Sequence, residues 1–275
     1  MSDSERGVYV YCIVTKGSEP SLQGLTGVGE ATVEGITAGE LTAIISRVPL
    51  DEFGSEPLKR NLENLEWLGR TARAHDAVLA SMMRSDAVAP MRLLTIFADD
   101  AGLLEMLERE RDSLSGALAR LRGHAEWSAK LLVDRDALQR AARERSSDVA
   151  STAATPQTTP GRAYFERKQS DRTTQQRARE LAQAAARETH TALGQQAADA
   201  RLLPAQNPEL SGRSGEMVLN GAYLVDRGRE RAFAEIVEQL RARHRGIGME
   251  LELTGPWAPY NFVGEAEQTS ATREP

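Results

Sequence analysis

One stretch combines a strand-like pattern with prolines and aromatic residues: Leu251-Glu252-Leu253-Thr254-Gly255-Pro256-Trp257-Ala258-Pro259-Tyr260-Asn261-Phe262-Val263. Apolar and acidic residues alternate where it begins, a period of two that is typical of a strand with one buried face. Gly255-Pro256 and Pro259 predict an abrupt end, because proline has no N–H and a fixed φ. The alternating residues are Met249, Leu251 and Leu253 on the buried side and Glu250 and Glu252 on the other.

Three aromatic residues follow the predicted strand within six positions: Trp257, Tyr260 and Phe262. Rings placed between prolines predict a segment that lies back rigidly on a domain surface. Since buried aromatic side chains usually supply packing area, we favour a structural role over a partner contact. We expect Trp257 to be buried in the second domain and its removal to unfold that domain.

Length and composition describe an ordinary soluble protein of two domains. The chain has 275 residues, 40% hydrophobic and 27% charged, with a net charge of −6. This mild acidity predicts no general attraction to nucleic acid or to an anionic membrane. The polar start and the lack of a long apolar run predict a cytoplasmic protein without a signal peptide or membrane span. The single cysteine, Cys12, lies in an apolar run and is expected to be a buried thiol.

The first half combines strands with amphipathic helices. Residues 8–14 are apolar at both alternating sets, which predicts a central strand, and residues 31–36 and 41–48 predict a hairpin. Pro90 makes residues 88–97 an edge strand or a strand end, and Asp99-Asp100 begins a second helix that Gly123 ends. A first helix is predicted from residue 56 to about residue 84. Its apolar stripe contains Leu58, Leu62, Leu65, Leu68, Ala72, His75, Leu79 and Met82.

The second half predicts the order strand, helix, short strand, strand, helix, strand, which is that of a ferredoxin-like βαββαβ domain. Residues 146–160 contain little to bury and predict a mobile loop. The predicted fold is therefore α+β with two domains. Residues 1–124 form an antiparallel sheet with two helices, residues 125–264 form the ferredoxin-like domain with its loop, and residues 265–275 form a disordered tail.

Signatures of catalysis are missing from the sequence. Phosphate-binding glycine loops, paired metal-ligand motifs and nucleophile elbows are absent, and the four histidines are widely spaced. We expect no enzyme activity, no cofactor and no metal. His75 lies on the apolar stripe, which predicts a hydrogen-bonded core histidine. An alternative in which Arg92 and His75 bind an anionic substrate stays open.

Several segments resemble the gas vesicle protein L/F family. Residues 254–263 are similar to its TGPWPPYSFV signature, and Leu94 stands where the similar PLRFGTLF motif has a glycine. The other similar segments, in family order, are residues 8–11, 67–68, 73–78, 90–97, 123–130, 161–168 and 218–225. The signature residues, for which we expect mainly structural roles, are Arg73, His75, Arg92, Trp127, Lys130, Asn220, Gly255, Pro256, Trp257 and Tyr260.

This resemblance implies participation in gas vesicle formation, in the cytoplasm and then on the vesicle. The implied partners are the small hydrophobic shell protein and other accessory proteins, with a role in nucleation and assembly. A shell subunit with exposed apolar strands aggregates unless it is held, and an open sheet edge can hold it. We expect that edge near the hairpin of residues 31–48. An alternative from another class is a ligand-sensing regulatory module of paired ferredoxin-like domains.

Overall fold

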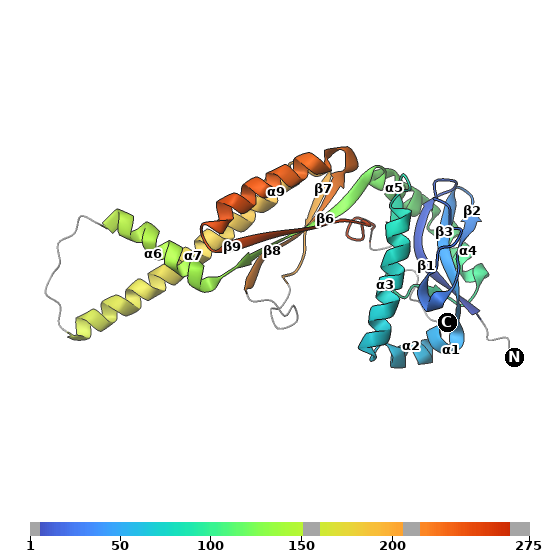
Figure 1. Cartoon of the computed structure of the whole chain (residues 1–275), viewed down its shortest axis with the longest axis horizontal. Helices are drawn as coiled ribbons and strands as arrows, with labels where there is room; N and C mark the ends of the chain where they lie inside the picture. Colours follow the sequence, from blue (N-terminus) through green and yellow to red (C-terminus); the bar gives the residue numbers. More distant parts are fainter. Residues whose placement is uncertain (1–5, 151–159, 206–214, 265–275) are drawn as a thin grey trace. The chain divides into compact units, whose positions relative to one another are not determined.

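The computed structural model describes residues 6–150, 160–205 and 215–264. The chain is a mixed α+β protein with two antiparallel sheets, one in each of two compact units (Figure 1). The first unit contains the chain up to Glu126 and the segment that begins at Pro256, and the second runs from Trp127 to Gly255. The predicted division gave residues 256–264 to the second domain. Ala258 and Tyr260 instead pack on the core of the first unit.

The sheet of the first unit has the strand order β2-β3-β1-β4, and β5 also pairs with β1. Residues 8–14 of β1 are fully buried, which confirms the predicted central strand. Cys12 is among them, and burial raises the pKa of its thiol. The elements of this unit are β1 (Arg6–Thr15), η1 (Val28–Glu30), β2 (Val33–Ala38), β3 (Leu41–Pro49), α1 (Leu50–Phe53), α2 (Ser55–Asn61), α3 (Leu65–Met82), β4 (Val88–Pro90), β5 (Ile96–Phe97), α4 (Asp100–Arg109) and α5 (Arg111–Leu121).

The predicted first helix is wrong in one respect, since α2 ends at Asn61 and α3 is a separate helix. The side chain of Asn64 accepts hydrogen bonds from the N–H groups of Glu66 and Trp67 and so caps a new helix. The break changes the phase of the apolar stripe. Leu62 and Leu65, predicted to be buried, are 43% and 82% exposed, whereas Trp67 is buried.

The second predicted helix is likewise divided, into α4 and α5, with Glu110 between them. The Asp99 side chain accepts a hydrogen bond from the Gly102 N–H at 2.9 Å, which confirms the predicted start. The predicted apolar stripe is buried in both helices and includes Leu103, Leu107, Leu114, Leu118 and Leu121.

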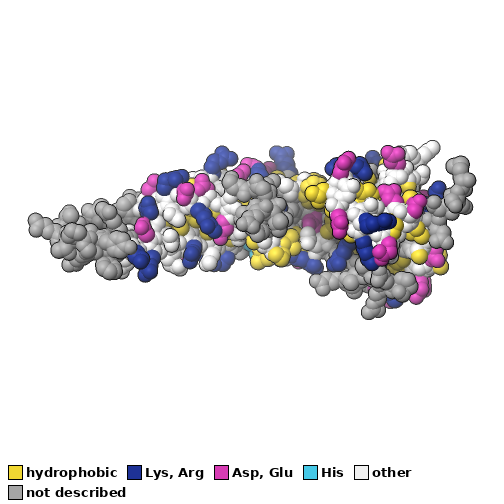
Figure 2. Space-filling view, turned by 90° about the horizontal axis from the view of Figure 1, so that it is seen from below, with side chains coloured by type: hydrophobic (Ala, Val, Ile, Leu, Met, Phe, Trp, Pro, Cys, Tyr) yellow, Lys and Arg dark blue, Asp and Glu magenta, His cyan; other side chains and the backbone are white. Residues whose placement is uncertain are grey.

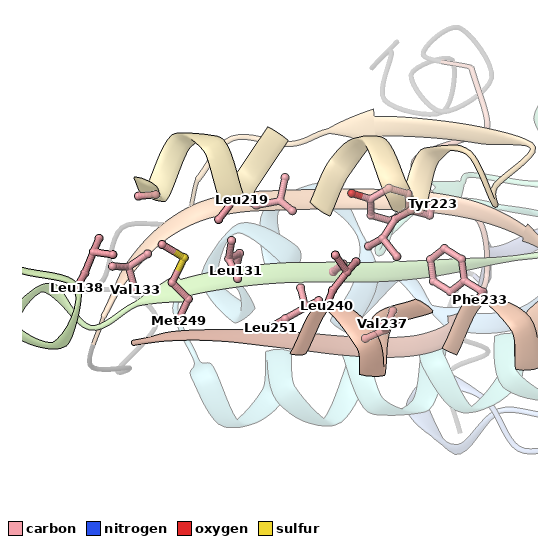
Figure 3. Packing of buried hydrophobic residues seen from close by; sticks show 14 of the residues in the cluster. Leu131, Val133, Leu138, Leu219, Tyr223, Phe233, Val237, Leu240, Met249 and Leu251 are labelled. Carbon is pink, nitrogen blue, oxygen red and sulfur yellow. The ribbon is translucent and has the colours of Figure 1, made fainter. Parts of the chain in front are cut away.

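The sheet of the second unit has the order β7-β8-β6-β9. Side chains of β6, β8 and β9 pack against α9 on one face of this sheet. Tyr223 of β8 and Phe233 of α9 are part of this core (Figure 3). The ferredoxin-like assignment of this unit stays a prediction. The elements are β6 (His124–Val133), α6 (Arg135–Ala150), α7 (Pro160–Gly194), β7 (Asp199–Leu202), β8 (Glu216–Asp226), η2 (Arg227–Arg229), α9 (Glu230–Arg245) and β9 (Met249–Trp257).

Both ends of the predicted loop of residues 146–160 are helical in the structure. Residues 146–150 continue α6, and α7 begins at Pro160. An existing helix can be extended by residues with little to bury, because each added residue gains a backbone hydrogen bond without the cost of a new nucleus. Residues 151–159 and the predicted tail, residues 265–275, lie outside the described residues.

Strand β9 differs in two respects from what residues 251–263 predict. It continues through Gly255 and Pro256 to Trp257. Gly255 has a φ of 137°, which glycine adopts readily, and Pro256 is tolerated because β9 is an edge strand of its sheet. Trp257 at the end of this edge is 52% exposed, so the prediction that it is buried is wrong.

Candidate functional site

The segment after β9 is fixed to the first unit by a chain of buried polar groups. The N–H of Leu94 donates to the Tyr9 hydroxyl at 3.1 Å, and that hydroxyl lies 2.9 Å from Nδ1 of His75. The Nε2 atom of His75 lies 2.8 Å from the hydroxyl of Tyr260. Helix α3 supplies the histidine and β1 supplies Tyr9, so this chain joins three parts of one unit.

All three rings of this chain are electrically neutral at ordinary pH. Burial lowers the pKa of His75 to about 4, and burial raises the pKa of both Tyr9 and Tyr260. His75 is 1% exposed and is the hydrogen-bonded core histidine that the sequence predicts. Arg92 is exposed, and His75 has both ring nitrogens next to tyrosine hydroxyls inside the core. This arrangement does not favour the alternative in which Arg92 and His75 together bind an anionic substrate.

A second anchor of the same segment involves Glu126. One carboxylate oxygen accepts from the N–H of Asn261 at 2.9 Å, and the other accepts from the Asn261 side-chain amide at 2.5 Å. Glu126 is 5% exposed, and Phe262 beside it is 3% exposed. The family-like segment therefore supplies packing and buried hydrogen bonds to the first unit.

Leu94 has a φ of 66°, in the left-handed region that favours glycine. The resembling family motif has a glycine at this position. Leu94 keeps the conformation although its side chain makes it costly, by about 1 kcal/mol or more. Its N–H donates to the buried Tyr9 hydroxyl at 3.1 Å, and this hydrogen bond helps to hold the strained residue in place.

The other signature residues are not gathered into one site. Trp127 and Lys130 are half-buried on β6, and the Trp127 ring packs 6.3 Å from that of Phe233. The side-chain amide of Asn220 donates to the Pro204 carbonyl at 2.8 Å. Arg73 is exposed on α3. Signature residues thus occur in both units, and most contribute local packing or hydrogen bonds.

The hairpin β2–β3 presents the sheet edge expected in the first unit. A two-residue loop, Gly39 and Glu40, joins the pair Ala38 and Leu41, and Gly39 has a φ of 58°. In such a hairpin alternate pairs are hydrogen-bonded, so the peptide groups of residues 33, 35 and 37 point away from β3. The Val33 N–H donates to the Leu25 carbonyl, which closes one end of this edge.

The remaining edge is short and open. Within the described part of the chain, the backbone of Gly35 and Thr37 has no hydrogen bond to a residue outside the sheet. The Thr37 hydroxyl lies 3.2 Å from that of Thr42 on β3, as expected for a pair whose peptide groups point outward. The outward-facing peptide groups of this edge are therefore those of Gly35 and Thr37. Sequence periodicity placed this hairpin correctly, but only the strand order shows that β2 is its free side.

Charged side chains lie beside this edge. Arg47 of β3 donates to Glu34 at 2.8 Å and forms a two-pronged ion pair with Asp100 at the start of α4. The hydrogen bond from Arg47 lowers the pKa of the Asp100 carboxyl. One guanidinium therefore pairs with two carboxylates, so these three side chains together carry an excess of negative charge.

The rest of the described surface is mixed. Basic and acidic side chains are interspersed on the face drawn in Figure 2. Among the described residues no three metal-binding side chains lie together, and no helix is long and apolar enough to cross a membrane. Among the residues whose burial is described, the exposed large apolar side chains are Leu62, Leu65, Leu104, Leu202 and Trp257.

Comparison with known proteins decides the family. Residues 7–264 match the family model described as gas vesicle synthesis protein GvpL/GvpF. The chain belongs to the GvpL/GvpF family. It is 36% identical to gas vesicle protein L of a Streptomyces species over 96% of both chains, and 27% identical to gas vesicle protein F of the same organism over 93% of this chain and 98% of that one. It has an accessory role in gas vesicles and associates with gas vesicle components.

The fold agrees with that of a solved family structure. The crystal structure of GvpF from Anabaena superimposes with a TM-score of 0.66 at 17% sequence identity, covering 94% of this chain and 96% of that one. The two antiparallel sheets and their helices are thus the architecture of a GvpF structure, reached by a sequence that has diverged far from it.

Proposed function

We propose that this GvpL/GvpF protein binds the hydrophobic shell protein of the gas vesicle and assists nucleation and assembly, without catalysis, together with other accessory proteins. The observation that carries the proposal is the open edge of β2 in the first unit. Main-chain groups at a sheet edge can pair with an extended segment of another protein. Gly35 and Thr37 supply these groups.

The physical need for such a partner is general. A subunit that forms a shell by apolar strands exposes these strands before assembly, and unpaired apolar strands aggregate. A short edge is suited to temporary holding, because a few main-chain hydrogen bonds give modest affinity. Release into the growing shell then requires little free energy.

The experiment is co-expression of the shell protein with two variants at one position. Thr37→Pro removes the outward N–H, and Thr37→Val keeps it, while both lose the hydroxyl contact with Thr42. We expect the shell protein to co-purify with the wild-type chain and with Thr37→Val, and to be lost with Thr37→Pro.

Thermal unfolding of both variants provides the check on folding. If the shell protein does not co-purify with the wild-type chain, the proposed function is wrong. If a folded Thr37→Pro variant captures it as well as Thr37→Val does, the shell protein is bound elsewhere on the molecule.

A further inference from the structure

Helix α4 lies next to the open edge strand β2 (Figure 1). At one end Asp100 reaches Arg47, which also holds Glu34 of β2. At the other end Nε of Arg111, just after α4, lies 3.8 Å from the position of a Cβ on Gly39. The two contacts fix the direction, so the helix starts near Glu34 and ends near the hairpin loop.

This direction places an apolar side chain of α4 beside the middle of β2. Leu104 is one helical turn after Asp100 on the same face, about 6 Å along the axis. Two residues of strand, from Glu34 to Ile36, cover about the same distance. From this spacing we expect Leu104, 39% exposed, to lie beside the half-buried Ile36. An added strand would meet an apolar position here and an acidic one two residues away.

Resting on the proposed function, we propose that the strand added to β2 is antiparallel and carries an apolar residue followed two positions later by Lys or Arg. Directly opposite residues of paired strands project on the same face. The apolar residue then lies opposite Ile36, against Leu104. Because an antiparallel partner runs the other way, its second following residue lies opposite Glu34. A basic side chain there offsets the negative charge that Glu34, Asp100 and Arg47 leave together.

The edge chemistry can be tested with three seven-residue peptides and the isotope-labelled full-length protein. The forward peptide is Thr-Ser-Val-Thr-Lys-Ser-Thr, the second is its reverse, and the third has Glu in place of Lys. Binding is followed by the NMR shifts of the Gly35 and Thr37 amides. We expect the forward peptide to bind about two- to fivefold more tightly than either of the others.

Matched variants of the protein test which of its residues cause the preference for the forward peptide. Glu34→Lys should invert the preference between the Lys and Glu peptides. Glu105→Lys makes the same change of charge one residue beyond Leu104 on an exposed position, and should leave the preference as it is. Leu104→Ser should weaken the forward peptide about two- to fivefold with little effect on folding, because that side chain is already partly exposed.

The outcomes separate this inference from the proposed function. Equal or tighter binding of the reversed peptide, an unchanged preference in Glu34→Lys, or the absence of shifts at Gly35 and Thr37 with every peptide overturns the strand rule. Capture of the shell protein that depends on the Thr37 N–H would then still stand. If the peptide rule holds but the shell protein is not captured, the edge chemistry is right and the proposed partner is wrong.

Discussion

The Nε2 atom of His75 lies 2.8 Å from the hydroxyl of Tyr260, a residue 185 positions later in the chain. Nδ1 of the same ring lies 2.9 Å from the Tyr9 hydroxyl. The histidine thus joins the central strand to the segment after β9. Protonation would add a charge inside the core, and burial makes that charge costly, which keeps the ring neutral.

The stability of the first unit should depend on pH through His75. Its folded pKa is about 4, below the ordinary value of 6.5. Between these two pH values His75 is mostly protonated in the unfolded chain and mostly neutral in the folded chain. Stability is therefore full above pH 6.5 and falls as the pH is lowered toward 4, by about 3 kcal/mol over the whole range. Urea unfolding at pH 7 and pH 5 measures the slope.

Two variants isolate this contribution. His75→Gln keeps a hydrogen-bonding side chain without the titration, and should lose most of the slope between pH 5 and 7. His124→Gln changes a histidine outside the core, whose Nδ1 faces the Arg122 carbonyl, and should keep the slope. An equal slope in His75→Gln and the wild-type chain would show that other groups cause the pH dependence.

Trp257→Ala should leave the fold intact. The side chain is 52% exposed at the end of an edge strand, so its removal costs far less than the 3–5 kcal/mol of a buried aromatic residue. We expect a loss of about 1 kcal/mol or less in the free energy of unfolding. Phe262→Ala, at a position 3% exposed in the same segment, should cost several times more. Similar losses in the two variants would contradict this difference in burial.

The strain at Leu94 predicts an inverted order of two substitutions. At ordinary positions alanine is more stable than glycine by about 0.4–1 kcal/mol, because it restricts the unfolded chain. At a φ of 66° alanine is strained and glycine is not. Leu94→Gly should therefore be more stable than Leu94→Ala, by about 1 kcal/mol. The neighbouring pair Leu93→Gly and Leu93→Ala, where φ is not positive, should keep the ordinary order.

Local patterns were sufficient for much of the fold. Some elements depend only on residues that are close together in the sequence. They are the apolar strand β1, the turn after Ala38 and the helix cap at Asp99. The break between α2 and α3 was not predictable from periodicity, because Leu58, Leu62, Leu65 and Leu68 keep a helical spacing across it. Only Asn64, a good capping residue, signalled a new start.

The candidate site depended on contacts that no local pattern contains. The partners of His75 lie 66 and 185 residues away, so the sequence could indicate a core histidine but not its tyrosines. The exposure of Trp257 likewise depends on structure beyond its neighbours in the sequence. The aromatic residues and prolines around Trp257 predict burial. The side chain is exposed because β9 is the last strand in the strand order of its sheet.

Two neighbouring glycines before β9 should respond oppositely to alanine. Gly248 has a φ of 74°, and a Cβ there would lie 2.4 Å from Cβ of Ala137 and 3.1 Å from backbone atoms of α6. Backbone strain and overpacking together should cost the second unit about 2–4 kcal/mol in Gly248→Ala. Gly246 has a φ of −66° and open space around it, so Gly246→Ala should be neutral or stabilise by about 0.4–1 kcal/mol.

Denaturant unfolding of the two glycine variants beside the wild-type chain gives both values. The contrast tests whether α6 packs against the turn before β9 as closely as the 2.4 Å approach requires. A small loss in Gly248→Ala, no larger than the strain of one left-handed residue, would mean that α6 can move away from the turn. A large loss in Gly246→Ala would place that glycine, too, in a conformation that excludes a side chain.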